Sequence, residues 1–185
     1  MGFVLLAVVV VVALWVVTAY NKLIALKNQV ANGWKQIDVQ LKRRHDLIPN
    51  LVNAVKGAIE FEKSTLEAVI SARNKAVSAT GVAQVAKAEG ELTQALGRLF
   101  ALSENYPQLK ATANIQQLQE ELVSTENKVG FARQLYNDVA TSYNTAQQQF
   151  PTNLVAGLAK ATPAELWEIE DAAERAVPNV DLKMN

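Results

Sequence analysis

Residues 2–19 read GFVLLAVVVVVALWVVTA, a stretch without a charged side chain that is dominated by valine, leucine and alanine. A helix of about 18 residues is about 27 Å long, which is close to the thickness of a bilayer's hydrocarbon core. No proline follows this stretch before Pro49, so nothing in the sequence separates it from the polar residues that come next. The sequence therefore predicts a membrane-spanning helix that continues directly into a polar helix.

The residues that flank this span are typical of a membrane interface. Trp15 and Tyr20 lie at the depth of an interfacial anchor, and the Lys22 side chain is long enough to reach the lipid headgroups. A cleaved signal peptide is the alternative, because Val17-Thr18-Ala19 resembles a cleavage site. However, no lysine or arginine precedes the apolar run, as a signal peptide requires, so we expect an uncleaved anchor.

Charge after the span predicts the orientation. Lys22, Lys27 and Lys35 follow it before the first acidic residue, Asp38. The positive-inside rule therefore predicts a short N-terminus outside and a C-terminal body in the cytoplasm.

Beyond the span, apolar residues recur at steps of three and four, which is typical of helices packed in a bundle. The first stripe runs from Val30 to Ala76, and Pro49 is expected to kink the helix or restart it near Ile48. Thr80-Gly81 predicts a stop, with Gly81 free to adopt a positive φ. A second helix is expected from about Val82 to Glu104, where Gly90 and Gly97 indicate either a close approach of another helix or a merely weakened helix.

The third predicted helix has the most regular pattern and suits an antiparallel bundle or a long coiled coil. Its seam consists of Ile115, Leu118, Leu122, Thr125, Val129, Ala132, Tyr136, Val139, Tyr143, Ala146 and Phe150, and Pro151 is expected to end it. Asn153 to Leu158 forms a short apolar turn. Thr162-Pro163-Ala164-Glu165 then has the pattern of a helix start and predicts an acidic, partly amphipathic helix up to Pro178.

These elements predict an all-α fold, in which an N-terminal transmembrane helix continues into a long antiparallel helical bundle of three long helices plus short C-terminal helices. We expect an anchor over residues 1–21, the bundle over 22–160, and an acidic C-terminal helix and tail over 161–185.

Composition argues against several functions. The formal net charge is zero, which does not favour nucleic-acid binding, and the absence of cysteine excludes disulfides and thiolate chemistry. The sequence has one histidine, His45, and lacks a Gly-rich phosphate loop. We therefore expect no enzyme activity, catalytic residue, cofactor, metal site or small-molecule substrate.

The densest polar cluster is Lys42-Arg43-Arg44-His45-Asp46. A basic patch at the membrane surface is one interpretation, although on a straight helix Lys42 lies about 30 Å beyond Lys22. The favoured interpretation is a solvated face plus Arg44 within the seam, paired with an acid such as Glu126, because a buried arginine needs a carboxylate. In a third interpretation this cluster meets the acidic tail (Glu168, Glu170 and Asp171) within or between protomers.

Several longer motifs resemble the LemA family. The main one is QIDVQLKRRHDLIPNLV at residues 36–52, and the others are YNKL at 20–23, YPQLKA at 106–111, LQEEL at 118–122, TENKV at 125–129, ARQLYND at 132–138, YN at 143–144, FPTNL at 150–154 and IED at 169–171. The resemblance implies an N-terminal transmembrane helix, an external N-terminus and a cytoplasmic antiparallel bundle, with no catalytic residues to carry over. The family includes a magnetosome membrane protein, so the resemblance also suggests membrane shaping.

The sequence thus favours a structural protein that self-associates as a homo-oligomer and acts as a scaffold or remodeller of the inner membrane, with the lipid bilayer as its partner. Confinement to a membrane raises the effective concentration, so weak lateral contacts suffice. The alternative is a membrane-tethered adaptor that presents the bundle to a partner protein such as a protease or kinase.

Overall fold

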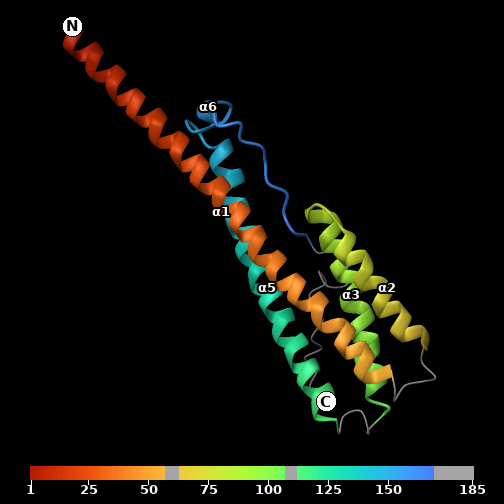
Figure 1. The fold of residues 1–185 in the computed structure, drawn as a ribbon. Helices are drawn as coiled ribbons and strands as arrows, with labels where there is room; N and C mark the ends of the chain where they lie inside the picture. Colours follow the sequence, from red (N-terminus) through yellow and green to blue (C-terminus); the bar gives the residue numbers. More distant parts are fainter. Residues whose placement is uncertain (57–62, 107–111, 169–185) are drawn as a thin grey trace, which may run out of the picture. The chain divides into compact units, whose positions relative to one another are not determined.

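The structure is a computed structural model that describes residues 1–56, 63–106 and 112–168. Within these residues the chain is all-α and contains helices α1 (Gly2–Lys56), α2 (Lys63–Ser78), α3 (Val82–Ser103), α5 (Ala113–Gln148) and α6 (Asn153–Ala156) (Figure 1). The chain divides into two compact units, one of residues 1–47 and 117–166 and the other of residues 48–116 and 167–185. Each unit is described by itself.

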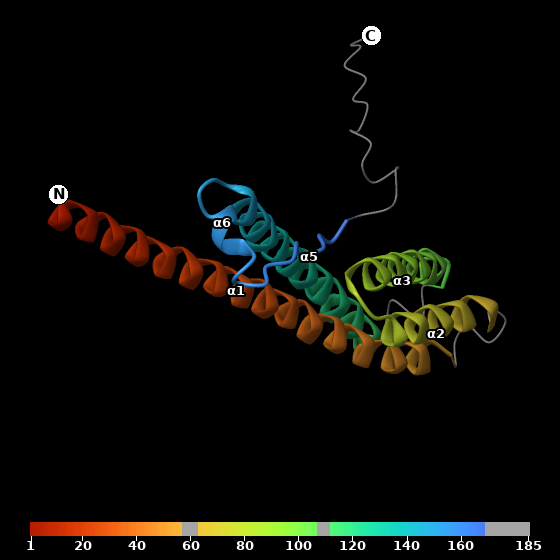
Figure 2. The ribbon, with the colours of Figure 1, turned by 90° about the horizontal axis from the view of Figure 1, so that it is seen from above.

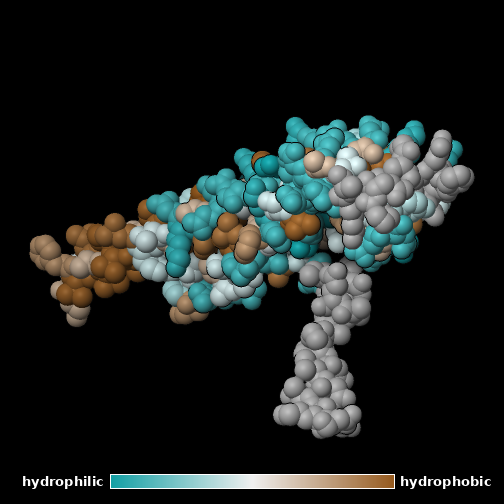
Figure 3. Space-filling model, turned by 90° about the horizontal axis from the view of Figure 1, so that it is seen from below, coloured by the Kyte–Doolittle hydropathy of each residue, from teal (hydrophilic) through white to brown (hydrophobic). Residues whose placement is uncertain are grey.

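The N-terminal part of α1 is apolar and exposed. Among the described residues, α1 is the helix long and apolar enough to cross a membrane, and only 6% of its most apolar window is buried. A helix in the core of a soluble domain would be mostly buried, so this exposure is compatible with membrane anchoring. Figure 3 shows the apolar surface gathered over this end of the helix, with mainly polar surface beyond it.

In the first unit, α1 and α5 pack antiparallel (Figures 1 and 2). Ile37 and Leu41 of α1 are buried at the spacing predicted from the sequence, and Leu23, which precedes the predicted stripe, is buried as well. The seam predicted for α5 is confirmed from Ile115 to Ala146, where every member is buried or half-buried. Its last predicted member is wrong: Phe150 lies beyond the end of α5 and is 80% exposed.

Pro49 does not restart the helix. Helix α1 continues to Lys56 with Pro49 inside it. A proline removes one backbone donor from a helix. The neighbouring residues Ile48, Leu51 and Val52 are buried, and their packing stabilises the helix although one hydrogen bond is missing. The boundary between the two units lies near this proline, between Leu47 and Ile48.

In the second unit, α2 and α3 lie side by side. Gly81 precedes α3 at a φ of 83°, so the predicted positive φ is confirmed. Lys75 Nζ of α2 lies 3.0 Å from Glu91 Oε2 of α3 and pairs with it. A Cβ added at Gly90 or Gly97 would meet nothing within 4 Å, so the described residues do not support a close helix approach at these glycines.

The helix predicted to start at Thr162 does not form there. Residues 161–168 contain no helix, and the backbone of Ala164 is bonded instead to a side chain of α5. These bonds hold the segment in a non-helical path, which overrides its local preference for a helix start. The rest of the predicted helix, including Glu170 and Asp171, lies outside the described residues.

Candidate functional site

Helices α1 and α5 of the first unit approach each other closely at Gly33. A Cβ added there would lie 3.4 Å from Tyr136 Cα and 3.5 Å from Val139 Cγ2. The next residue, Trp34, packs edge-to-face on Tyr136, with ring centroids 5.5 Å apart and an interplanar angle of 63°. Gly33 was not identified from the sequence, because its place beside the apolar stripe does not distinguish it from Gly97.

A buried ion pair lies farther along the same two helices. Arg44 Nη2 of α1 is 2.9 Å from Glu126 Oε2 of α5, and the two side chains are 4% and 35% exposed. The structure therefore brings together the two residues that the sequence analysis named as a pair. At 2.9 Å this is a close contact between opposite charges. Breaking such a pair would leave a buried guanidinium without its charge partner.

The segment of residues 161–166, named here the strap, is fastened to α5 by side-chain to backbone hydrogen bonds. Asn144 Nδ2 donates to the Ala164 carbonyl at 2.8 Å, and Asn144 Oδ1 accepts from the Ala164 N–H at 2.7 Å. The Tyr136 hydroxyl donates to the Glu165 carbonyl at 2.6 Å. One asparagine amide thus satisfies both backbone groups of a residue, much as a neighbouring strand would. The sequence analysis did not identify this role for Asn144.

The strap also changes the acidity of Tyr136. Burial raises the pKa of its hydroxyl above the usual value of 10.0, and the negative charge of Glu165 raises it further. Both causes disfavour the phenolate. The hydroxyl therefore stays protonated as a hydrogen-bond donor throughout the physiological range.

An apolar groove of about 480 Å³ runs between α1 and α5 on the outside of the first unit. Its floor and walls carry exposed apolar side chains, with Val39 63%, Phe131 74% and Leu135 44% exposed. Lys35 and Lys128 flank them, one from each helix. Grouped large apolar side chains on a surface mark a contact site more often than scattered ones do. We name this surface the lateral groove.

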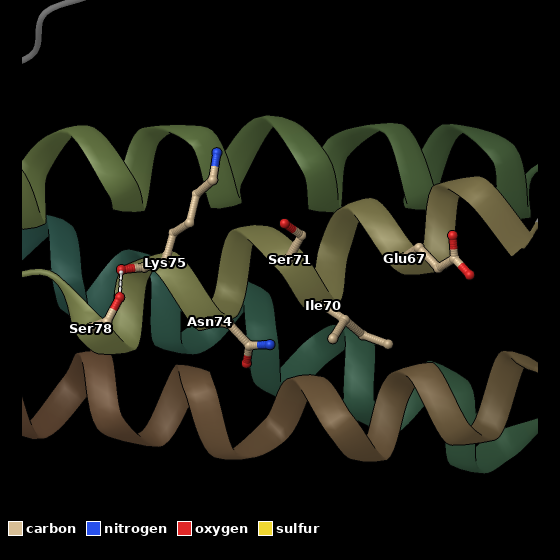
Figure 4. A pocket seen from close by; sticks show the side chains of 6 residues that line it. All are labelled: Glu67, Ile70, Ser71, Asn74, Lys75 and Ser78. Atoms are coloured by element: carbon tan, nitrogen blue, oxygen red, sulfur yellow. Dashed lines mark hydrogen bonds between the residues drawn. The ribbon is translucent and has the colours of Figure 1, made fainter.

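A second concave surface, in the other unit, has no catalytic arrangement. Its six lining residues all come from α2, spread along one helix (Figure 4). Ser78 Oγ donates to the Lys75 carbonyl, and Lys75 Nζ is paired with Glu91. Neither side chain therefore activates the other as a nucleophile would need. Within the described residues, no group of three histidine, cysteine or acidic side chains is placed to hold a metal ion.

The basic cluster of residues 42–46 divides between two environments. Lys42, Arg43 and Asp46 are exposed, whereas Arg44 and His45 are buried. A single helix face cannot present all of these side chains together, because successive residues point about 100° apart. This arrangement agrees with a solvated face plus an arginine held inside the bundle.

The remaining residues named from the sequence are exposed or half-buried where the structure describes them. Trp15 is half-buried, and Tyr20, Lys22 and Glu168 are exposed. The assignment of Trp15, Tyr20 and Lys22 to a membrane interface, and a meeting of the acidic tail with the basic cluster, remain predictions.

The similarity of this chain to known proteins extends over the bundle and is not limited to the apolar span. A sequence model described as the LemA family matches residues 33–182. The chain is similar to magnetosome proteins MamQ 2 and MamQ 1 of Paramagnetospirillum magneticum, each 23% identical over 184 aligned residues that cover 85% of this chain and 68% of the relative. It is also similar to protein LemA of Metamycoplasma hominis, 29% identical over 138 residues that cover 74% of this chain and 63% of the relative.

Proposed function

The chain belongs to the LemA family, and we propose that it is a membrane-anchored helical bundle that self-associates into a scaffold which organises or remodels the bacterial inner membrane. The observation that carries the proposal is the lateral groove. It is formed partly by α1, the same helix whose first residues are apolar and exposed. Contacts made at the groove would therefore act directly on the helix that enters the bilayer.

The chemistry of the groove favours a second copy of this chain as its occupant. All copies anchored in one membrane stand parallel, and a two-fold axis parallel to the helices would place Lys35 and Lys128 of one copy against the same lysines of its neighbour. Like charges at such a contact repel. A neighbour bound through a different face, carrying an exposed acid such as Asp38, avoids this repulsion. Contacts between unlike faces propagate into rings or filaments, which suits a scaffold.

Membrane confinement makes such contacts sufficient even when each is weak. Anchoring restricts the copies to a plane and raises their effective concentration. The similarity to magnetosome proteins supports a role at a membrane by association alone. We propose that the bundle acts without catalysis, in keeping with the helix-only arrangement of the described residues and with the surroundings of Lys75 and Ser78.

The proposed orientation places the bundle in the cytoplasm and the short N-terminus outside. Its support is the sequence of Lys22, Lys27 and Lys35 after the span. A C-terminal tag should be protected from protease in intact spheroplasts and become sensitive after lysis. Cleavage of the tag in intact spheroplasts would reverse the orientation.

Imaging tests self-association. The full chain, purified in mild detergent, is expected to form large ordered rings, cups or filaments by negative-stain electron microscopy. Phe131→Asp, which places a charge in the groove, should reduce the assembled fraction at least tenfold. Val123→Asp is the matched control, because Val123 is a 56% exposed residue of α5 that does not line the groove. Monomers or small oligomers of the unmodified chain would overturn the scaffold and favour an adaptor that binds a partner protein.

A further inference from the structure

Three large apolar side chains are exposed around the short helix α6. Phe150 is 80% exposed, Leu154 67% and Leu158 69%. They follow one another at steps of four residues, in a segment of turns that contains the four-residue helix α6. Val155 and Ala159 of the same segment are buried, at 2% and 6% exposed. This segment thus has its own core contacts and presents a second apolar face outward, which we name the outer stripe.

Packing places the segment beside the end of the apolar span. Leu23 of α1 forms a buried cluster with Ala146 and Ala159, and Ala156 packs against it. Figures 1 and 2 both show α6 beside α1. Leu23 follows Ala19, the end of the uncharged stretch, by four residues, which is about 6 Å along a helix. The headgroup layer on each side of a bilayer is about 5–8 Å thick. A span that ends at Ala19 would therefore place Ala156 and Ala159, which pack on Leu23, at the level of the headgroups.

Basic residues border the same region. Lys22 and Lys27 are exposed on α1 next to the cluster, and Lys160 is exposed at the end of the segment. Lys160 has a φ of 45°, in the left-handed region that favours glycine, and the Ala161 N–H closes the turn on the Ala156 carbonyl at 3.0 Å. A lysine is less stable than a glycine in this backbone conformation, but it adds a positive charge at this position. Apolar side chains bordered by lysines are typical of segments that lie in a membrane interface.

We propose that residues 150–160 form a second membrane contact, in which the outer stripe inserts into the headgroup and upper acyl region of the bilayer that α1 crosses and the bordering lysines bind lipid phosphates. The inference rests on the proposed membrane anchoring. A single helix in a bilayer can tilt and rotate, whereas two contacts fix both motions. The bundle then keeps a defined orientation to the membrane plane, which ordered lateral assembly needs.

Site-directed spin labelling tests this contact, because the chain contains no cysteine and each introduced thiol takes one label. Leu154→Cys and Leu158→Cys report on the outer stripe in the full chain reconstituted into liposomes of phosphatidylethanolamine and phosphatidylglycerol. Val9→Cys serves as the reference for lipid. Val123→Cys serves as the reference for water, since Val123 is exposed on α5 beyond Glu126. Circular dichroism verifies that each variant keeps its helix content.

The readout is the ratio of label collisions with oxygen, which concentrates in lipid, to collisions with a water-soluble nickel chelate. Labels at residues 154 and 158 are expected to show a ratio several-fold above that at residue 123 and closer to that at residue 9. If they match residue 123 while residue 9 reports lipid, the second contact is wrong and the anchor stands. If residue 9 also reports water, the proposed anchoring itself is wrong. Shielding of residues 154 and 158 from both reagents would mean that protein covers the stripe, which overturns the proposal.

Discussion

At the scale of single residues, glycines in helices of this chain have different roles that only their surroundings reveal. Gly33 lies against the backbone of Tyr136, whereas Gly97 has open space where a side chain would start. Both are glycines in sequences of high helix propensity, so their local sequence does not distinguish them. The difference arises because Gly33 is on the face of α1 that meets α5.

Replacing Gly33 by leucine should therefore destabilise the first unit. A side chain at this position must displace Tyr136 or Val139, and forced overpacking costs about 1–3 kcal/mol. Gly97→Leu is the control and should be neutral or stabilise by up to ~1 kcal/mol, because a helix-favouring residue replaces an exposed glycine. Urea unfolding of the full chain in detergent, followed by circular dichroism, measures both. Equal effects of the two substitutions would contradict the close approach at Gly33.

Replacing each of the two buried tyrosines of α5 by phenylalanine should change the free energy of unfolding in different ways. The Tyr136 hydroxyl donates to the strap, whereas the Tyr143 hydroxyl is buried without a hydrogen-bond partner in the described part of the chain. Tyr136→Phe should cost about 1 kcal/mol of unfolding free energy, and Tyr143→Phe should be neutral or stabilising. The same unfolding measurement at pH 7 decides between them.

The raised pKa of Tyr136 adds a pH dependence to this comparison. Because the unfolded tyrosine ionises at a lower pH than the folded one, the stabilisation is complete below pH 10.0 and is lost as the pH rises toward the folded pKa. The stability advantage of the wild type over Tyr136→Phe should therefore shrink above pH 10. An advantage that stays constant up to pH 11.5 would show that the hydroxyl is not held in its protonated form.

At the scale of elements, sequence periodicity predicts this fold well wherever a helix has one buried face. The seam of α5 follows steps of three and four from Ile115 to Ala146, and each member faces the core because a regular helix keeps that face constant. The pattern fails at Phe150, since α5 ends at Gln148 and a periodic sequence does not state where its helix stops. Phe150 belongs to the exposed outer stripe and not to the core.

The strap illustrates what local sequence signals cannot predict. Thr162-Pro163-Ala164-Glu165 has good helix-start chemistry, but Asn144, about twenty residues earlier, binds both backbone groups of Ala164. A tertiary contact of this kind leaves no mark in the local pattern. The Arg44–Glu126 pair could be named from the sequence because a charge inside an apolar seam demands a partner.

Asn144 therefore gives a prediction about the strap as a unit. Asn144→Ala removes both hydrogen bonds to Ala164 and should raise the hydrogen exchange of residues 161–166 at least tenfold while α5 stays protected. Asn144→Asp retains the acceptor for the Ala164 N–H and loses the donor to its carbonyl, so its exchange should be intermediate. Hydrogen exchange followed by mass spectrometry resolves the segment. Unchanged protection of the strap in Asn144→Ala would mean that other contacts hold it.

At the scale of the whole molecule, the proposed roles separate along the chain: the span confines the protein to the membrane, and the lateral groove joins copies. The span is a run of valine and leucine without paired small residues at the spacing that favours helix association in membranes. Self-recognition is therefore expected from the bundle, and the span contributes concentration.

Deleting residues 1–20 separates these contributions. The shortened chain should keep its helical content beyond the span and should assemble only at much higher concentration, because it no longer gains from confinement in a plane. Analytical ultracentrifugation over a hundredfold range of concentration measures the shift. Assembly at the concentration at which the full chain assembles in liposomes would mean that anchoring adds nothing. If assembly is lost even at the highest concentration, the span itself carries the contact.

Because α1 is one continuous helix, it also fixes the distance between the apolar span and the lateral groove. Val39 of the lateral groove follows Ala19 by twenty residues of continuous helix, about 30 Å along the axis, so the proposed anchoring would hold the groove at one height above the lipid in every copy. Neighbours then meet at equal height without any further adjustment. Seven residues inserted after Tyr20, before the part of α1 that packs against Ala146 and Ala159, would raise the groove by about 10 Å and nearly preserve its direction around the helix axis, because seven residues make close to two turns. Lengthened copies should assemble with one another but not with copies of natural length. A membrane that holds both should therefore contain separate assemblies of each.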